Sequence, residues 1–327
     1  MTASMLVLIV LALIFDFLNG IHDSSNIVAT MIASRAFNPR TALGTAAIAN
    51  FLGPFIFGVA VATTIGAEVV DENAITITVI LAALVSAIVW NILTWFLGIP
   101  SSSSHALIGG ILGAVLIGAG PAAIKPDGLM KVLVFLFISP IIGLAAGFIF
   151  TRVVFFLSRA ATPRINWFFR KAQIISATGL ALSHGSNDAQ KTMGIITLGL
   201  VTTGYMTTFQ VPVWVIFACA TAIGLGTMLG GWSLIKTLGA RFYKIRAVDG
   251  FCAQSTSALV ILGSSLLGGP VSTTQVVSSA IMGVGAAERL NKVRWGVGKE
   301  IAFAWLVTIP ATVVLSAGIY WFVSLFS

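Results

Sequence analysis

Long apolar runs follow one another along this chain, separated by short polar or charged stretches. A helix that crosses a bilayer takes about 20 apolar residues, whereas a transmembrane barrel shows alternating segments of about 10. The runs lie at 4–34, 41–64, 74–97, 99–120 and 131–151 in the first half, and at 172–201, 213–235, 247–268, 270–286 and 300–324 in the second. This pattern predicts an all-α polytopic membrane protein.

The composition excludes a soluble globular protein. Of the 327 residues, 57% are hydrophobic and 9% are charged, whereas soluble domains carry about 25% charged residues. The net charge of +8 does not indicate a nucleic-acid partner, because the basic residues lie in a few loops between apolar runs. The cysteines, Cys219 and Cys252, are predicted to be packing residues, and no cofactor is expected.

The charged loops predict an orientation in the membrane. Basic residues gather in four loops, which face the cytoplasm by the positive-inside rule: Arg35 and Arg40; Arg152, Arg159, Arg164, Arg170 and Lys171; Lys236, Arg241, Lys244 and Arg246; and Arg289, Lys292, Arg294 and Lys299. The acidic loop with Glu68, Asp71 and Glu72 then faces outward, as do both termini. Five crossings per half give the halves opposite orientations. This predicts an inverted repeat of 1–157 and 172–327, joined by a basic cytoplasmic connector at 158–171.

One polar motif occurs in the first apolar run of each half. Its copies are Gly20–Asn26 (GIHDSSN) and Gly185–Lys191 (GSNDAQK), 165 positions apart. Glycine followed by polar residues predicts a break in the helix that frees backbone groups. Asp23 and Asp188 are costly in hydrocarbon unless each holds a cation, a proton or a basic partner. Duplicated breaks of this kind are typical of a transporter's binding site near the membrane midplane.

A second matched pair of motifs is rich in hydroxyl groups. Pro100–His105 (PSSSSH) and Pro270–Gln275 (PVSTTQ) begin 80 and 85 residues after the two motif glycines. Each precedes an apolar helical run, so its hydroxyls fall at a helix N-terminus, where free N–H groups and the helix dipole bind oxyanions. One Ser or Thr would be enough for simple capping. Three or four neighbouring hydroxyls favour a site for a tetrahedral anion.

Basic side chains lie within or beside these motifs. Lys191 is three residues after the aspartate of its motif, which favours pairing with that aspartate over reaching to the membrane interface. At the equivalent place the first copy has Asn26, whose side-chain oxygen is a cation ligand. The histidines His22, His105 and His184 also fall here. Histidine titrates near neutral pH and can carry protons, although a hydrogen-bonding role is the alternative for each of them.

Taken together, these motifs resemble the inorganic phosphate transporter (PiT) family. The resemblance covers nearly the whole chain, including Ala253–Thr256 and Val293–Trp295. It implies secondary transport of orthophosphate, not an enzyme, through an inverted-repeat bundle with broken and re-entrant helices. The phosphate side of the site would consist of Ser102, Ser103, Ser104, Ser272, Thr273 and Thr274. The side that handles the coupling ion or proton would consist of His22, Asp23, Asn26, Asn187, Asp188 and Lys191.

Two positions depart from what the resemblance implies for sodium-coupled members. His22 stands where those members tend to have asparagine, and Lys191 replaces the last asparagine of the second motif. Both put a basic group in place of a neutral oxygen ligand. Members similar in this respect form the proton-coupled bacterial branch, which can take phosphate together with divalent metal. We therefore expect proton coupling, with a sodium ion at Asp23, Asn26 and Asp188 as the alternative metal site.

The sequence thus predicts a multi-pass protein of the cell membrane that imports inorganic phosphate by alternating access. A sulfate permease of the same family and a sodium-coupled phosphate symporter are the alternatives within this class. An intramembrane enzyme acting on a phosphorylated lipid and a passive anion channel are the alternatives outside it. The expected partners are phosphate, the coupling proton or sodium ion, and the bilayer. The sequence leaves open whether the protein forms a homo-oligomer.

Overall fold

Helices make up almost all of the structure. A computed structural model describes residues 2–72, 74–99, 101–231 and 242–325. Its helices are α1 (Ala3–Ala33), α2 (Pro39–Phe57), α3 (Ala60–Thr63), the π-helix η1 (Thr64–Glu68), α4 (Ile77–Leu97), α5 (Ser103–Gly118), the 3₁₀ helix η2 (Pro121–Ala123), α6 (Pro126–Leu157), α7 (Ile165–Thr202), α8 (Val213–Leu229), α10 (Ala247–Leu266), α11 (Thr273–Glu288), the 3₁₀ helix η3 (Leu290–Lys292) and α12 (Trp295–Ser324). These described residues contain no strand, so the all-α prediction is confirmed.

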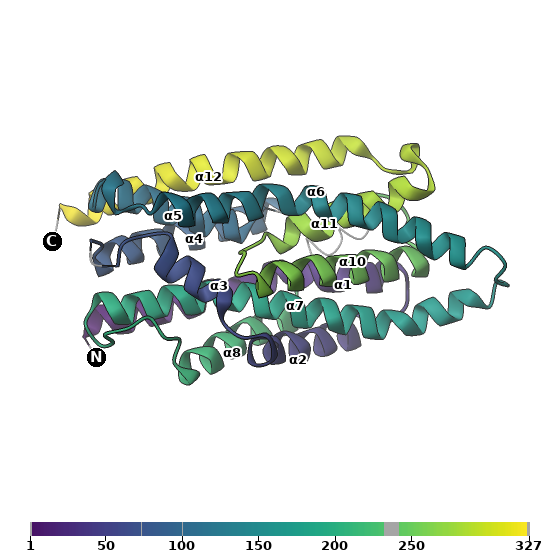
Figure 1. Cartoon of the computed structure of the whole chain (residues 1–327), viewed down its shortest axis with the longest axis horizontal. Helices are drawn as coiled ribbons and strands as arrows, with labels where there is room; N and C mark the ends of the chain where they lie inside the picture. The colour runs from purple at the N-terminus through teal and green to yellow at the C-terminus, as the bar shows by residue number, and fades with distance from the viewer. Residues whose placement is uncertain (1, 73, 100, 232–241, 326–327) are drawn as a thin grey trace.

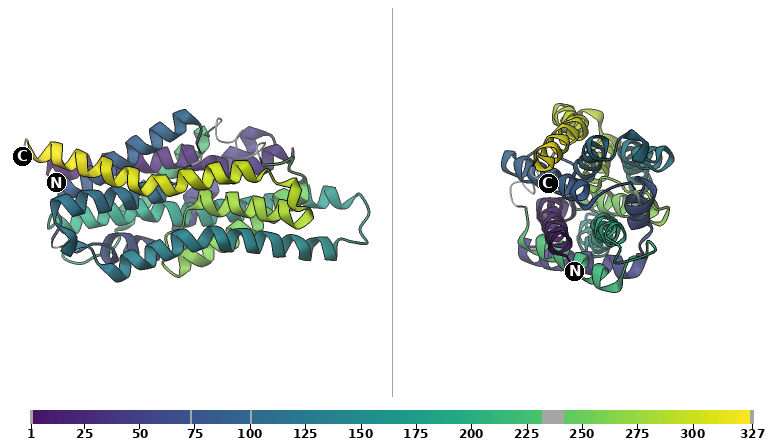
Figure 2. Two further views of the ribbon diagram at one scale, coloured as in Figure 1. Left: turned by 90° about the horizontal axis from the view of Figure 1, so that it is seen from above. Right: turned by 90° about the vertical axis from the view of Figure 1, so that its left-hand side faces the viewer.

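The long helices run along one axis of the molecule. Both termini lie at one end of the bundle, which we call the termini end (Figures 1 and 2). The segment between α6 and α7 lies at the opposite end, which we call the connector end (Figure 1). This segment comprises residues 158–164, so residues 165–171 of the predicted connector belong to α7.

The surface and the interior have the polarity expected in a membrane. Large apolar side chains such as Phe96, Ile175, Val213 and Val314 are 73–78% exposed, whereas carboxylates, amides and hydroxyls are buried in the interior. By length and apolar composition, four of the described helices can cross a membrane: α1, α4, α6 and α12. A fifth is added if the bent pair of α2 with α3–η1 counts as one span. The outer face of the bundle is therefore suited to lipid.

The two helices that carry the aspartate motifs are continuous, so the predicted breaks are wrong. α1 passes through Gly20, and α7 passes through Gly185, without interruption. Both glycines instead allow close helix packing. A Cβ atom at Gly20 would lie 2.4 Å from the carbonyl oxygen of Ile223 on α8, and one at Gly185 would lie 2.1 Å from that of Asn50 on α2. Small residues let membrane helices approach closely, and that need is met here within regular helices.

A bend occurs instead within the predicted run 41–64. α2 and the α3–η1 segment form a pair bent by 75°. Pro54 lies in the last turn of α2, and Gly58 follows with a φ of 81°, which glycine adopts without steric cost. In the second half, α8 ends at Leu229. Residues 232–235 of the predicted run 213–235 lie outside the described residues, as do Lys236 and Arg241 of the third basic loop and Pro100 of the first hydroxyl motif.

Two shorter helices, α5 and α11, begin in the middle of the bundle and run toward opposite ends (Figure 1). A short non-helical segment leads into each of them, after Gly98 and Gly268, which have φ values of 65° and 71°. Ser102 and Ser272 are the N-caps, and each side chain accepts a hydrogen bond from the backbone N–H three residues on. The hydroxyl motifs therefore lie at helix N-termini, as predicted.

The two halves of the chain pack reciprocally. α5 packs against α12 of the other half, and α11 packs against α6. Likewise α1 packs against α8, and α7 packs against α2. Because the halves are interleaved in this way, the N-terminal tips of α5 and α11 meet near the aspartate motifs of α1 and α7.

Candidate functional site

Two aspartates from different halves meet at the centre of the bundle. Asp23 on α1 and Asp188 on α7 are 1% and 0% exposed. The hydroxyl of Thr273, the first residue of α11, lies 3.3 Å from Asp23 Oδ2 and 3.0 Å from Asp188 Oδ2. A hydroxyl has one proton to donate, so Thr273 donates to one carboxylate at a time and ties the tip of α11 to both.

Asp188 is paired with a buried lysine. The ammonium of Lys191 contacts Asp188 Oδ1 one turn away along α7, and it donates to the carbonyl oxygen of Val271 at 3.0 Å. Ser104 at the tip of α5 donates to the same carbonyl at 3.0 Å. Lys191 is 1% exposed, so it does not reach a membrane interface. Removing either partner of such a pair leaves an uncompensated buried charge.

Asp23 has no lysine partner and is surrounded by weaker donors. The Nδ2 group of Asn26 and the hydroxyl of Thr274 each donate to Asp23 Oδ1 at 2.9 Å. His22 Nδ1 lies 3.3 Å from the same oxygen. His22 Nε2 and Asn26 Oδ1 are buried and have no hydrogen-bond partner among the described residues. The α1 side therefore keeps unused hydrogen-bonding capacity next to its carboxylate.

His184 bridges the two carboxylates, although it was not among the predicted site residues. Its Nε2 lies 3.1 Å from Asp188 Oδ2 and 3.7 Å from Asp23 Oδ2. The signal available in the sequence was its position four residues before Asp188, which places both side chains on one helix face.

A chain of hydrogen bonds indicates the protonation state of His184. Thr227 donates to the carbonyl oxygen of Ile223 at 2.9 Å, so it accepts from Nδ2 of Asn50 at 2.7 Å. Asn50 Oδ1 then faces His184 Nδ1 at 3.2 Å and must receive a proton from it. Nε2 faces two carboxylates and also needs a proton. Nε2 lacks the geometry of a hydrogen bond to either carboxylate, so the two negative charges that face it, and not a donated bond, favour the second proton. With both ring nitrogens protonated, His184 is an imidazolium, and with Lys191 it balances the two carboxylates.

Asn187 is not brought to the carboxylates. Its Nδ2 donates to Ser265 Oγ at 2.7 Å and to the carbonyl oxygen of Gly269 at 3.3 Å. Its Oδ1 accepts from the backbone N–H of Val271 at 3.4 Å. Asn187 therefore holds the segment that leads into α11, and it supports the site from outside.

The hydroxyls at the tip of α5 have different partners from those of α11. Ser102 caps α5, and its Oγ lies 2.7 Å from His105 Nδ1. Ser103 is 4% exposed, and Ser104 donates to the segment that leads into α11. No hydrogen bond joins these three hydroxyls to either aspartate within the described part of the chain. The two tips meet, but only α11 engages the carboxylates.

The side chains of the site are buried in the bundle. The predicted site residues on α1, α5, α7 and α11 and at the two caps are all at most 4% exposed. Two helix N-termini with their hydroxyls point to this buried place, which suits a tetrahedral oxyanion. The neighbouring carboxylates, lysine and histidines supply groups that exchange or balance charge.

The alternative sodium site at Asp23, Asn26 and Asp188 fits this arrangement poorly. Asn26 turns its Nδ2, not its oxygen, toward Asp23, and the same Nδ2 lies 3.0 Å from Thr274 Oγ1. One oxygen of Asp188 is already bound to the lysine. Asp23, His184 and Asp188 offer ligand atoms within 4.8 Å of one another, so they form a set for a divalent ion only after His184 has lost a proton.

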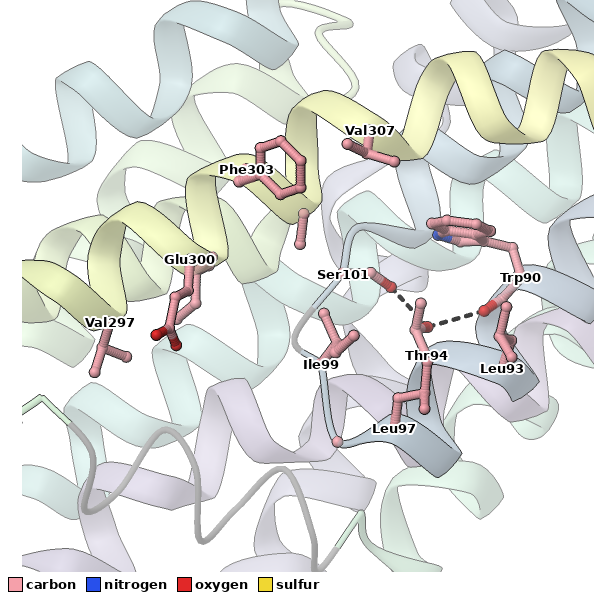
Figure 3. Close-up of a pocket in the computed structure, with 13 residues that line it drawn as sticks. Trp90, Leu93, Thr94, Leu97, Ile99, Ser101, Val297, Glu300, Phe303 and Val307 are labelled. Carbon is pink, nitrogen blue, oxygen red and sulfur yellow. Dashed lines mark hydrogen bonds between the residues drawn. The ribbon is translucent and has the colours of Figure 1, made fainter.

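A cavity of about 380 Å³ lies at the side of the bundle between α4 and α12 (Figure 3). At its edge, Ser101 donates to Thr94 Oγ1 at 2.8 Å, and Thr94 donates to the carbonyl oxygen of Trp90 at 2.9 Å. The lining is largely apolar and includes the carboxylate of Glu300. A carboxylate in apolar surroundings repels an anion, so this cavity is not a candidate for the oxyanion site.

Comparisons with known proteins agree with one another. The sequence model of the Phosphate transporter family matches residues 19–316. The chain is 44% identical over 324 residues to the "Probable low-affinity inorganic phosphate transporter" of Bacillus subtilis, covering 98% of this chain and 97% of that protein. It is 45% identical over 315 residues to the protein of the same name from Rhizobium meliloti, covering 96% and 94%. A solved structure titled "The sodium-dependent phosphate transporter" has the same fold, with a TM-score of 0.90, 24% identity and 100% of both chains covered.

Proposed function

This chain belongs to the phosphate transporter family, and we propose that it imports inorganic phosphate across the cell membrane by proton symport. The family is one of transporters and not of enzymes, so an intramembrane enzyme is set aside. The relatives from Bacillus subtilis and Rhizobium meliloti are named for inorganic phosphate, which supports phosphate over sulfate as the substrate.

Phosphate binds, in this proposal, between the tips of α5 and α11. Free N–H groups and the positive ends of two helix dipoles converge there. The hydroxyls of Ser102, Ser103, Ser104, Ser272, Thr273 and Thr274 add donors without adding charge. In the described part of the chain, arginines lie in loops or near helix ends, away from the tips. Binding by dipoles and hydroxyls alone is consistent with a low-affinity transporter.

The observation that best supports proton coupling is the position of His184 between Asp23 and Asp188. In the buried site, two carboxylates are balanced by this imidazolium and by Lys191. Phosphate adds negative charge, which a buried site holds only if positive charge enters with it. Asp23 and the unpartnered Nε2 of His22 are the groups placed to receive those protons.

Alternating access is supported by a buried site between interleaved halves. The reciprocal packing of α5 on α12 and of α11 on α6 favours the predicted inverted repeat of 1–157 and 172–327, in which rocking of the halves opens one end at a time.

At the connector end, Asp249 lies 3.1 Å from both Arg246 and Lys292, and Lys292 lies 2.7 Å from Glu288. This network joins α10 to α11 and is placed to close that end. By the positive-inside rule, the connector end is cytoplasmic and both termini are outside.

Separate ion gradients test the coupling. Purified protein in proteoliposomes receives labelled phosphate with either an inward proton gradient and no sodium, or an inward sodium gradient at equal pH. We expect accumulation with the proton gradient and its loss on addition of an uncoupler. Accumulation that requires sodium and survives the uncoupler would contradict proton coupling. Failure of excess phosphate to compete with labelled sulfate would contradict the substrate.

A matched pair of histidine variants sharpens this test. His184→Gln removes the cation between the carboxylates, so we expect proton-driven uptake to fall about 100-fold or more, the scale of a lost proton-transfer group, and its dependence on pH to disappear. His22→Gln removes one of the two proposed proton acceptors but leaves Asp23 and His184 in place, so it should retain part of the accumulation, with a shifted pH profile. A wild-type pH profile in His184→Gln would exclude the His184 bridge as the basis of the proton coupling.

A further inference from the structure

A third buried carboxylate, that of Asp16 on α1, lies outside the site described above. It is 0% exposed, and neither of its oxygens has a hydrogen-bond partner among the described residues. Asn19 Oδ1, one turn further along α1, and Thr192 Oγ1 on α7 are buried and unpartnered as well. Thr192 and Asp16 are neighbours, although the pair lacks the geometry of a hydrogen bond. We call Asp16, Asn19 and Thr192 the outer cluster.

The outer cluster lies between the aspartate pair and the termini end. Asp16 precedes Asp23 by seven residues, or about 10 Å along the helix, and Thr192 follows Asp188 by one turn. The backbone N–H of Thr2, just before α1, donates to the hydroxyl of Tyr205, just after α7, at 2.6 Å. The start of α1 and the end of α7 are therefore neighbours at the termini end. Going from Asp23 to Asp16 along α1 and going from Asp188 to Thr192 along α7 both lead toward that end.

The charged and titratable groups around Asp16 leave it without a counterion. On α7 these groups are Asp188, Lys191 and His184, and both cations are already bound to the aspartate pair. On α8 the thiol of Cys219 lies within electrostatic range of Asp16. A carboxylate in the membrane interior that lacks a cation is costly, and such a group takes up a proton instead.

A proton satisfies this cluster better than a metal cation does. Protonated Asp16 donates to Asn19 Oδ1, and the hydroxyl of Thr192 donates to its other oxygen, so each unpartnered group gains a partner. Sodium sites in transporters draw on backbone carbonyls freed where a helix is unwound. α1 and α7 are continuous here, so their carbonyls are engaged within the helices.

We infer that the outer cluster is a second proton-binding site, with the proton on Asp16, and that it exchanges protons with the group of Asp23, His184 and Asp188 from the termini side. The exchange rests on the proton coupling proposed above, whereas the proton on Asp16 does not.

Infrared spectroscopy of the purified protein reads this proton directly, because a protonated carboxyl group has a carbonyl band that a carboxylate lacks. We expect the band at neutral pH in the wild type, its loss in Asp16→Asn, and a shift in Asn19→Leu, which removes the acceptor. Thr197→Val is the matched control, because Thr197 is another buried hydroxyl of α7 without a partner among the described residues; it should leave the band unchanged.

Two outcomes would overturn the proton site. One is a carbonyl band that Asp16→Asn leaves unaltered. The other is a rise in melting temperature with sodium chloride over choline chloride that the wild type shows and Asp16→Asn does not, which would assign the cluster to sodium.

Phosphate uptake tests the proposed exchange of protons between Asp16 and the group of Asp23, His184 and Asp188. With an inward proton gradient, Asp16→Asn should lower the initial rate of phosphate uptake about tenfold or more, Asp16→Glu should restore much of it, and Thr197→Val should not change it. A wild-type rate in a variant that has lost the band would overturn the exchange. If the wild type itself shows no proton-driven uptake, the coupling at the aspartate pair fails, while the infrared band still decides the proton on Asp16.

Discussion

On α7 the aspartate of the motif is bound to a lysine, whereas on α1 the equivalent aspartate faces an amide, hydroxyls and a histidine. Lys191 contacts Asp188 and the carbonyl oxygen of Val271. Asn26, at the equivalent place, donates to Asp23 with its Nδ2, while its Oδ1 remains unpartnered. One copy of the motif is electrostatically complete, and the other retains capacity for protons.

The two hydroxyl-rich tips differ in the same sense. Thr273 and Thr274 at the tip of α11 donate to the carboxylates, so they fix the relation of α11 to α1 and α7. Ser103 at the tip of α5 is not engaged in that way. The motifs of the second half, on α7 and α11, therefore hold the site together. Those of the first half, on α1 and α5, are free to respond to substrate and protons.

The largest expected effect comes from removing the lysine. Lys191→Met leaves Asp188 without its nearest cation, and breaking a buried ion pair costs about 3–5 kcal/mol, so we expect little folded protein and no uptake. Asn26→Leu, the matched change on α1, removes a hydrogen bond donated to a carboxylate but no charge, and it should cost about 1.5–3 kcal/mol. Melting of the detergent-purified variants and phosphate uptake measure both effects.

The double variant Asp188→Asn with Lys191→Met serves as the control for this prediction. It removes both charges, so folded protein should return while concentrative uptake stays absent. If Asn26→Leu destabilises the protein more than Lys191→Met does, the α1 copy and not the α7 copy holds the site together, and the comparison is reversed.

A smaller effect is expected from the hydroxyls at the tips. Thr273→Val keeps the shape of the side chain but releases both carboxylates from α11. A lost hydrogen bond to a charged group costs about 1.5–3 kcal/mol, so the rate of proton-driven uptake should fall roughly 10–150-fold. Ser103→Ala should mainly raise the KM for phosphate, because a single neutral donor of about 0.5–1.5 kcal/mol is lost, which corresponds to roughly 2–12-fold. Equal losses of maximal rate in the two variants would show that the tips do not differ in function.

Much of this arrangement follows from the sequence, because it depends on local pattern. The apolar runs, the two hydroxyl-capped helix starts and the pair of Lys191 with Asp188 each rest on spacing within one segment. The continuity of α1 and α7 does not. A glycine such as Gly20 can either break a helix or let another helix pack closely against it. Here it packs against the carbonyl of Ile223 on α8, which is far away in the chain, so the local sequence does not distinguish the two roles.

Two features that lack a repeated counterpart do not follow from the sequence: the bridging role of His184, which was named only as a possible proton carrier, and the buried carboxylate of Asp16. The protonation of His184 depends on Asn50 and Thr227, which come from α2 and α8, and no sequence spacing connects the three. Asp16 lies before the duplicated motif, and Ala181 stands at its place in the second copy. Repetition of the motifs therefore does not point to Asp16 or to the link of His184 with Asn50 and Thr227.

The smallest effect concerns the N-caps of the two tips. Among the described residues, Ser272 accepts the N–H of Gln275 and has no further hydrogen bond, whereas Ser102 accepts the N–H of His105 and also bonds its ring Nδ1 at 2.7 Å. Ser272→Ala should cost about 1 kcal/mol, as for other lost caps, and Ser102→Ala about 0.5–1.5 kcal/mol more, because a second hydrogen bond is lost. In a His105→Leu background the two costs should become equal, measured by melting without phosphate. Equal costs already in the wild-type background would mean that the ring of His105 does not stabilise the α5 tip.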